Sequence, residues 1–220
     1  VHTYCDLRKV CSTLDAFNIG GGLKIHEALD EEIPYAYLIE EIVATIKKIC
    51  QERKVPEPNI FTEFGSHTVG ESGAIIYSVI GQKQQNDFER WYTIDSSFIT
   101  TLPEIWGIKQ KFIMLPLNYW NKAYQRIHLG GITNDAMDYY KIEKSENQIF
   151  LPDVGPDEKL IIGFFHTGAY QEALGGYGGI QHCLTPAPRH IVINKKNGKL
   201  VYEVFSEEQD SASMMKTLGY

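Results

Sequence analysis

The sequence has few cysteines, because Cys5, Cys11, Cys50 and Cys183 are the only four in 220 residues. Their spacing never gives the paired C-x-x-C pattern of a zinc or redox site, and their density is far below that of a disulfide-rich secreted protein. We therefore expect neither a metal site nor a disulfide framework, and we interpret the cysteines as the reduced thiols of a cytosolic protein.

The sequence also lacks a long apolar run and an excess of positive charge. No apolar stretch approaches the ~18 residues that a membrane span requires, and no charged-then-apolar leader precedes the fold. Lysine and arginine total 21 against 28 aspartates and glutamates, so the net charge is −7. An acidic chain without a basic cluster repels phosphate backbones. We expect a soluble, cytoplasmic protein that binds neither nucleic acid nor membrane.

The chain does have the composition of a folded protein, with 43% hydrophobic residues. A short apolar run at Phe17–Ile19 predicts a buried strand that ends at three glycines. From Tyr35 onward, apolar residues recur with the spacing of one helical face, and Pro56 stops this predicted helix. A second strand is predicted at Asn59–Glu63. The order of strand, glycine turn, helix and strand is typical of a parallel sheet or a β/α barrel.

Beyond about residue 82 the pattern changes to short β-rich runs. Segment 82–90 is polar and charged, and we interpret it as a linker. Strands are predicted near Trp91–Ile94, Phe112–Leu115, Arg126–Leu129, Leu160–Phe165, Ile191–Asn194 and Leu200–Phe205. Asn197-Gly198 between the last two indicates a hairpin turn. The predicted fold class is therefore α/β followed by all-β, with an α/β domain at 1–82 and a mostly antiparallel β domain at 83–220.

Three segments that follow predicted strands are candidates for a binding site. Gly20, Gly21 and Gly22 could close their backbone N–H groups around a phosphate, or they could form a simple tight turn. Glu63 could pair with a cationic ring nitrogen, as carboxylates do in pyridoxal phosphate enzymes, or it could be a solvated rim residue. Tyr170 could donate its hydroxyl to a phosphate, or it could be a buried tyrosine with a backbone partner. These residues alone leave the alternatives open.

Taken together and in this order, the segments resemble those of a known family. Asn-Ile-Gly-Gly-Gly, Thr-Glu-Phe-Gly and Gly-Ala-Tyr-Gln-Glu are similar to segments of the pyridoxal-phosphate-dependent decarboxylases of the alanine-racemase type, which act on basic amino acids. Within that family, Leu102–Ile108 and Gly168–Gly175 are most similar to the biosynthetic arginine decarboxylases. The resemblance covers most of the chain.

The resemblance implies a β/α barrel followed by a β domain, with residues 1–82 as the last part of the barrel. It also implies pyridoxal phosphate as cofactor, a small basic amino acid as substrate, and a homodimer or higher homo-oligomer with active sites at the subunit interface. In this family arginine loses its carboxylate as carbon dioxide and becomes agmatine.

The resemblance further implies roles for particular residues. The implied cofactor contacts are Gly20, Gly21, Gly22, Glu63, Ser66 and Tyr170, and the implied catalytic residues are Asn134 and Asp135. Among them, the glycines and Tyr170 would bind the cofactor phosphate, and Glu63 would bind the pyridinium nitrogen. Asp135 would meet the distal cationic group of the substrate, since a fixed carboxylate complements a guanidinium.

Two of these positions depart from the family pattern. Ser66 stands where the family usually has a phosphate-binding arginine, and Asn134 stands where it usually has a cysteine that donates a proton. Serine brings no charge, and asparagine is not a comparable acid. These departures favour an alternative hypothesis, in which the chain is a non-catalytic homologue that acts as a binding or regulatory protein.

The lysine that carries the cofactor in this family lies far upstream of the glycine run. Lys9 lacks the family's surrounding pattern, and Lys24 matches no family lysine position. Because a complete β/α barrel needs ~250 residues, we expect the last quarter of the barrel plus the β domain, inactive alone. Uncovered sheet edges then predict self-association or local disorder in about the first 80 residues.

Overall fold

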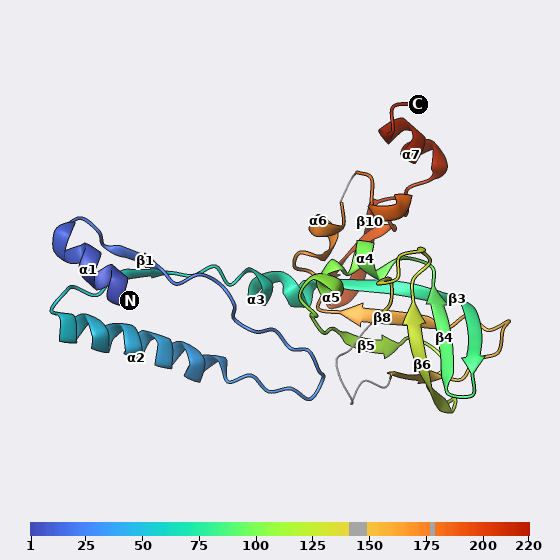
Figure 1. Cartoon of the computed structure of the whole chain (residues 1–220), viewed down its shortest axis with the longest axis horizontal. Coiled ribbons are helices and arrows are strands. Elements are labelled where there is room, and N and C mark those ends of the chain that lie inside the picture. Colours follow the sequence, from blue (N-terminus) through green and yellow to red (C-terminus); the bar gives the residue numbers. More distant parts are fainter. Residues whose placement is uncertain (141–148, 177–178) are drawn as a thin grey trace. The chain divides into compact units, whose positions relative to one another are not determined.

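A computed structural model describes residues 1–140, 149–176 and 179–220, which form two compact units, Val1–Ser72 and Gly73–Tyr220 (Figure 1). The elements of the first unit are α1 (His2–Val10), β1 (Ala16–Asn18), α2 (Tyr35–Arg53), β2 (Asn59–Phe61), α3 (Gly65–Val69) and the 3-10 turn η1 (Gly70–Ser72). The assignment of domains at 1–82 and 83–220 stays a prediction.

The first unit contains the predicted strand, helix and strand in the predicted order. β1 and β2 pair in parallel, with Asn18 opposite Phe61. The helix α2 ends at Arg53 and is capped by Lys54, whose left-handed backbone conformation (φ 54°) lets its N–H bond the helix carbonyls before Pro56. A chain can join two parallel strands only through a crossover, which α2 supplies here.

A small apolar cluster holds the first unit together. It consists of Tyr4 and Cys5 of α1 with Ile46 and Cys50 of α2, and Phe17 of β1 packs against it. The prediction of a buried first strand was wrong, because Phe17 is only half-buried and its neighbours in β1 are exposed. Only β1 contacts this cluster, through Phe17, whereas all of β2 is exposed. The helix α1 was not predicted. Only two of its residues are buried, and its nine residues are fewer than the window over which apolar periodicity marks a helix.

The second unit is mostly antiparallel β structure. Its strands are β3 (Ala74–Asn86), β4 (Glu89–Ile94), β5 (Ile113–Pro116), β6 (Tyr124–Gly130), β7 (Ile149–Pro152), β8 (Ile161–Phe165), β9 (His190–Lys196) and β10 (Lys199–Ser206). Six of them form one sheet in the order β5-β8-β3-β4-β6-β7, in which only β4 and β6 run parallel. The strands β9 and β10 form a separate hairpin, whose turn at Asn197-Gly198 has the two positive φ angles predicted for that dipeptide.

Among the described residues of this unit, five short helical segments accompany the strands. They are α4 (Phe98–Thr101), α5 (Pro103–Gly107), α6 (Gln171–Gly175), η2 (His182–Leu184) and α7 (Ser211–Thr217). The aromatic centre of the core joins α4 to the sheet, because the ring of Phe164 lies 5.6 Å from that of Tyr77, 5.8 Å from that of Phe98 and 5.0 Å from that of Tyr140. Edge-to-face packing of this kind adds to the free energy gained by burial.

The predicted linker at 82–90 is instead part of a hairpin. Gln82 pairs with Tyr92, and Asn86 pairs with Glu89, so β3 and β4 continue to the turn between them. Lys83 to Asn86 are exposed, and a strand that projects into solvent carries polar residues on both faces. That exposure explains why the segment had the composition of a linker. Neither β3, which begins at Ala74, nor the short strand β7 was predicted.

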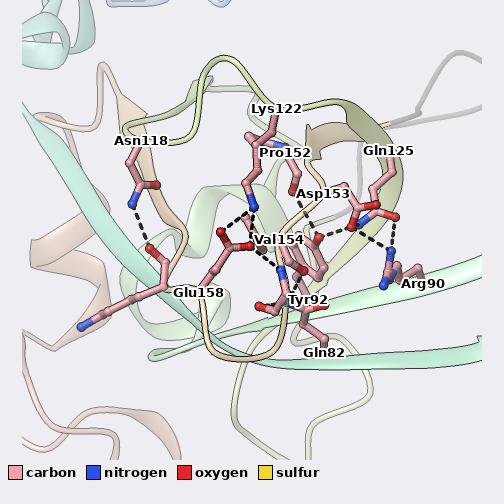
Figure 2. Close-up of polar contacts among 12 residues, drawn as sticks. Gln82, Arg90, Tyr92, Asn118, Lys122, Gln125, Pro152, Asp153, Val154 and Glu158 are labelled. Atoms are coloured by element: carbon pink, nitrogen blue, oxygen red, sulfur yellow. Dashed lines mark hydrogen bonds and ion pairs between the residues drawn. The ribbon is translucent and has the colours of Figure 1, made fainter.

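A polar network holds the segment that follows β7 onto the sheet (Figure 2). The hydroxyl of Tyr92 donates to the Pro152 carbonyl over 3.2 Å, and the Gln125 amide donates to Asp153 over 2.9 Å. The Gln82 amide donates to the Val154 carbonyl over 3.0 Å. Because these side chains satisfy one another or the backbone, we interpret the network as structural rather than as a binding site.

Candidate functional site

The glycine turn and Glu63 lie side by side in the first unit, just beyond the carboxyl ends of β1 and β2. The N–H of Ile19 donates to the Phe61 carbonyl over 3.0 Å, and the N–H of Glu63 donates to the Gly20 carbonyl over 2.9 Å. The parallel pairing therefore continues past the strands and brings two predicted site segments into contact. The carboxyl edge of parallel strands is where α/β folds bind their ligands.

Glycine is the residue that fits this turn without a steric clash or backbone strain. A Cβ atom on Gly21 would lie 2.6 Å from the carbonyl oxygen of Glu63, which is closer than such atoms approach one another. Gly20 and Gly22 have φ angles of +76° and +98°, in the region that favours glycine. The turn is consequently bare of side chains, and its backbone can be approached closely by an anion.

Asn18, the last residue of β1, connects the turn to the carboxylate. Its Oδ1 accepts a hydrogen bond from the N–H of Gly20 over 2.8 Å, and its Nδ2 donates to Oε1 of Glu63 over 2.6 Å. Sequence reasoning missed Asn18. The signal available was an amide side chain directly before a glycine turn, on the strand next to the one that ends at an acidic residue.

Ser66 lies near Glu63 in the sequence, as the second residue of α3, and it is half-buried. Lys24 lies beyond the glycine turn, and its half-exposed side chain is paired with acidic side chains. Its Nζ bonds Glu31 and lies 3.8 Å from Glu27. The bond to Glu31 is the largest of the contacts that raise the pKa of Lys24. These ion pairs therefore favour the protonated form of the Lys24 ammonium.

Tyr170 belongs to the second unit and precedes α6. Its φ is 64°, which is rare for a tyrosine, and its side chain is exposed to 54%. The alternative of a buried tyrosine with a backbone partner is therefore wrong. An exposed hydroxyl on a constrained backbone is suited to donate to a ligand.

The two segments most similar to arginine decarboxylases meet at Gln171. Its buried side-chain amide donates to Glu104 over 2.6 Å and to the Ala169 carbonyl over 3.0 Å. Its Oε1 accepts from the backbone N–H of Glu104 over 3.3 Å. One side chain thus fixes α5 against the turn that carries Tyr170.

Asn134 and Asp135 lie in the loop between β6 and residue 139. Asn134 is exposed, and Asp135 is half-buried. Oδ1 of Asp135 accepts a hydrogen bond from the N–H of Met137 over 2.8 Å, and the Asp135 carbonyl accepts from the N–H of Asp138 over 3.0 Å. Asp135 therefore has a defined conformation within a tight turn.

Asp138, which sequence reasoning also missed, organises this loop. It is buried, with 5% of its surface exposed. Its carboxylate accepts from the N–H of Phe98 over 2.8 Å, and from both the N–H and the hydroxyl of Thr133 over 3.1 and 2.6 Å. A Cβ on Gly131 would overlap this carboxylate, at 2.2 to 2.4 Å. The N–H and hydroxyl groups satisfy a buried carboxyl group whose burial would otherwise be costly.

The predicted site residues thus fall into two groups, one in each unit. Gly20, Gly21, Gly22 and Glu63 are brought together with Asn18 in the first, and Ser66 follows them in the sequence. Asn134, Asp135 and Tyr170 lie in the second. That the two groups share one active site stays a prediction.

Two kinds of feature are absent from the described residues. None of their helices is both long and apolar enough to cross a membrane. Among the same residues, no group of three or more histidine, cysteine, aspartate or glutamate side chains is placed to hold a metal ion.

Curated relatives match parts of the chain, although no family model does. The biosynthetic arginine decarboxylase of Marinobacter nauticus is 38% identical over 87 residues, which cover 37% of this chain and 14% of that protein. That of Proteus mirabilis is 33% identical over 144 residues, which cover 62% of this chain and 22% of that protein. The match therefore spans less than a quarter of either relative.

Solved structures share the fold. The biosynthetic arginine decarboxylase of Campylobacter jejuni has a TM-score of 0.82 at 21% identity, over 100% of this chain and 51% of that one. A diaminopimelate decarboxylase from M. jannaschii has a TM-score of 0.75 at 18% identity, over 98% of this chain and 45% of that one. The predicted fold class and the resemblance drawn from the sequence are both confirmed.

Proposed function

We propose that this chain is the carboxyl-terminal portion of a pyridoxal-phosphate-dependent decarboxylase of the alanine-racemase type, which converts arginine to agmatine and carbon dioxide. We call the longer polypeptide of this proposal the parent protein. The observation that carries the proposal is the glycine turn bonded to the strand end that presents Glu63. The similarity of this chain to arginine decarboxylases favours arginine as the substrate among the basic amino acids.

The residues present suit pyridoxal phosphate. The turn has no side chain that would block a phosphate, and a Cβ at Gly21 would collide with the Glu63 carbonyl. Glu63 offers an exposed carboxylate for the ring nitrogen, and Tyr170 offers an exposed hydroxyl for the phosphate. A related lysine decarboxylase has been solved with pyridoxal phosphate and cadaverine. When bound, the cofactor supplies the electron sink that lets an amino acid lose its carboxylate.

In this proposal Asp135 recognises the substrate. Its half-buried carboxylate is fixed by the Met137 N–H, so binding a cation costs little side-chain entropy. A guanidinium presents several N–H donors in one plane and can bond a carboxylate through two of them. Asp135 would therefore hold the distal end of arginine while its α-carbon reacts.

Two residues limit this chemistry. Ser66 can donate a hydrogen bond to the phosphate but adds no positive charge, so phosphate affinity rests on backbone N–H groups and Tyr170. The α-carbon must gain a proton after carbon dioxide leaves, and the neutral amide of Asn134 cannot supply it. Water or another side chain of the parent protein must act as that acid.

We also propose a cytoplasmic homodimer or higher homo-oligomer. The free thiols of Cys5, Cys11, Cys50 and Cys183 suit a reducing compartment. The active site at the subunit interface is what the resemblance implies for the loop that carries Asp135.

The test is to incubate the parent protein with arginine, ornithine, lysine and diaminopimelate and to measure carbon dioxide and the amine products. We expect agmatine from arginine, and visible absorbance from bound pyridoxal phosphate. Asp135→Asn should raise KM for arginine at least tenfold, because a charge-assisted hydrogen bond is lost. Asp157→Asn, at an exposed turn, is the matched control.

Ser66 and Asn134 favour one other candidate function, a non-catalytic homologue that binds or regulates. A well-folded parent protein that forms no amine from any of the four substrates and has no visible absorbance would support this candidate and refute the decarboxylase.

A further inference from the structure

The side chain of Asn18 contacts both halves of the cofactor site in the first unit. It accepts from the Gly20 N–H over 2.8 Å through one end of its amide and donates to Glu63 over 2.6 Å through the other. We propose that Asn18 is a positioning residue, which orients the Glu63 carboxylate toward the cofactor's ring nitrogen and couples it to the glycine turn. This inference rests on the proposed function.

The orientation of the amide follows from its two partners. A backbone N–H can only donate, so Oδ1 must face Gly20, and the carboxylate of Glu63 then receives the Nδ2 group. Within the described ranges, Oε1 of Glu63 has this donor and Oε2 has none. One carboxylate oxygen is thereby held by the protein while the other stays open to a ligand.

Asparagine is the residue type that this position requires. Aspartate would keep an acceptor for Gly20 but would set a second negative charge against Glu63. Leucine or alanine would bond neither group. Because β1 and β2 are paired in register, with Asn18 opposite Phe61, an amide of this length reaches the strand end that presents Glu63.

The two groups that Asn18 bonds would bind opposite ends of the same cofactor. The glycine turn would take the phosphate, and Glu63 would take the ring nitrogen. A side chain bonded to both reduces the freedom of each before the ligand arrives, and this preorganisation favours binding.

The first measurement tests the contact itself in the full chain. We expect Glu63→Ala to shift the side-chain amide resonance of Asn18 in ¹⁵N NMR spectra, whereas Glu57→Ala, at an exposed position of the same unit, leaves it unchanged. Asn18→Ala should speed hydrogen exchange of the Gly20 amide, and Asn18→Asp should not, since it retains the acceptor. An Asn18 resonance indifferent to Glu63→Ala refutes the inference.

The second measurement is a double-mutant cycle on the affinity of the parent protein for pyridoxal phosphate. Asn18→Ala should weaken binding about tenfold, as expected for a lost hydrogen bond to a charged group, but less than about twofold in the Glu63→Ala background. Asn59→Ala, at the opposite end of β2, is the matched control and should leave the affinity unchanged.

The outcomes separate the two proposals. An equal loss in both backgrounds means that Asn18 does not act through Glu63, and it overturns this inference while leaving the proposed function intact. A folded parent protein that binds no pyridoxal phosphate overturns the proposed function and the cofactor role of Asn18 together, even where the NMR contact is present.

Discussion

At the scale of single residues, backbone contact at Gly21 decides the shape of the candidate phosphate turn. We expect Gly21→Ala to lower the free energy of unfolding by about 1–3 kcal/mol, because the new methyl group must displace the Glu63 carbonyl. It should also weaken binding of pyridoxal phosphate to the parent protein. Urea unfolding followed by circular dichroism measures the first effect, and equilibrium dialysis measures the second.

Gly65→Ala is the matched control for that substitution. A Cβ at Gly65 would have no neighbour within 4 Å, and the residue lies in a helix, where alanine is favoured over glycine. If both variants were as stable as the original chain, the close approach at Gly21 would not constrain the turn.

Asp138 is the residue on which the conformation of the Asp135 loop depends. Asp138→Ala would leave the N–H of Phe98 and both donors of Thr133 without their acceptor. Each buried unsatisfied group costs about 1–3 kcal/mol, so we expect a loss of about 3 kcal/mol in the free energy of unfolding. Urea unfolding measures it, and Asp157→Ala, at an exposed turn, should change it by less than about 0.5 kcal/mol.

At the scale of elements, the contact of α5 with α6 depends on a partly buried carboxyl. Burial raises the pKa of Glu104, and the hydrogen bond from Gln171 only partly opposes this. A carboxyl whose pKa is higher in the folded state binds its proton more tightly there than in the unfolded chain. Its contribution to stability is thus fully present below the unfolded pKa and is lost as the pH rises through the folded one.

Glu104→Gln tests that expectation, because the amide can accept from Gln171 without a charge. As the pH rises from about 4 to 8, the original chain should lose stability relative to this variant. The measurement is urea unfolding at several pH values, with Glu203→Gln on the exposed face of β10 as control. A difference between the original chain and Glu104→Gln that does not vary with pH would contradict the role of burial.

At the scale of the whole chain, uncovered strands predict self-association. β2 is exposed along its length, and Phe61 within it is exposed to 58%. The hairpin of β9 and β10 places Ile191, Ile193, Leu200, Tyr202 and Val204 on one face, and all five are exposed. Apolar faces and unpaired edges of this kind promote association.

We therefore expect light scattering coupled to size-exclusion chromatography to give a mass that rises with the concentration of this chain. Phe61→Lys and Ile193→Lys should each lower it, since a charge on an exposed strand opposes association. Thr62→Lys, at an exposed polar position that follows β2, adds the same charge without removing an apolar side chain. A monomeric mass at all concentrations would refute the prediction.

The sequence by itself determined the order of elements and the chemistry at their ends. The period of apolar residues from Tyr35 gave the helix, Asn197-Gly198 gave the hairpin, and the short apolar runs gave most of the strands, because these signals are local. It also identified the glycine turn and Glu63 as candidate site segments, and a backbone hydrogen bond connects them in the structure. Sequence reasoning failed where composition reflected exposure, as at 82–90, where a projecting hairpin has the polarity of a linker.

Only the tertiary structure decided which side chains hold these segments in place. Asn18, Gln171 and Asp138 bond groups that are 45, 67 and 40 positions away in the chain, namely Glu63, Glu104 and Phe98. No periodicity or short motif records such a pairing, because it depends on strand register and on which helix packs beside which turn. Local pattern therefore predicted where the candidate site begins, and long-range hydrogen bonding determined its shape.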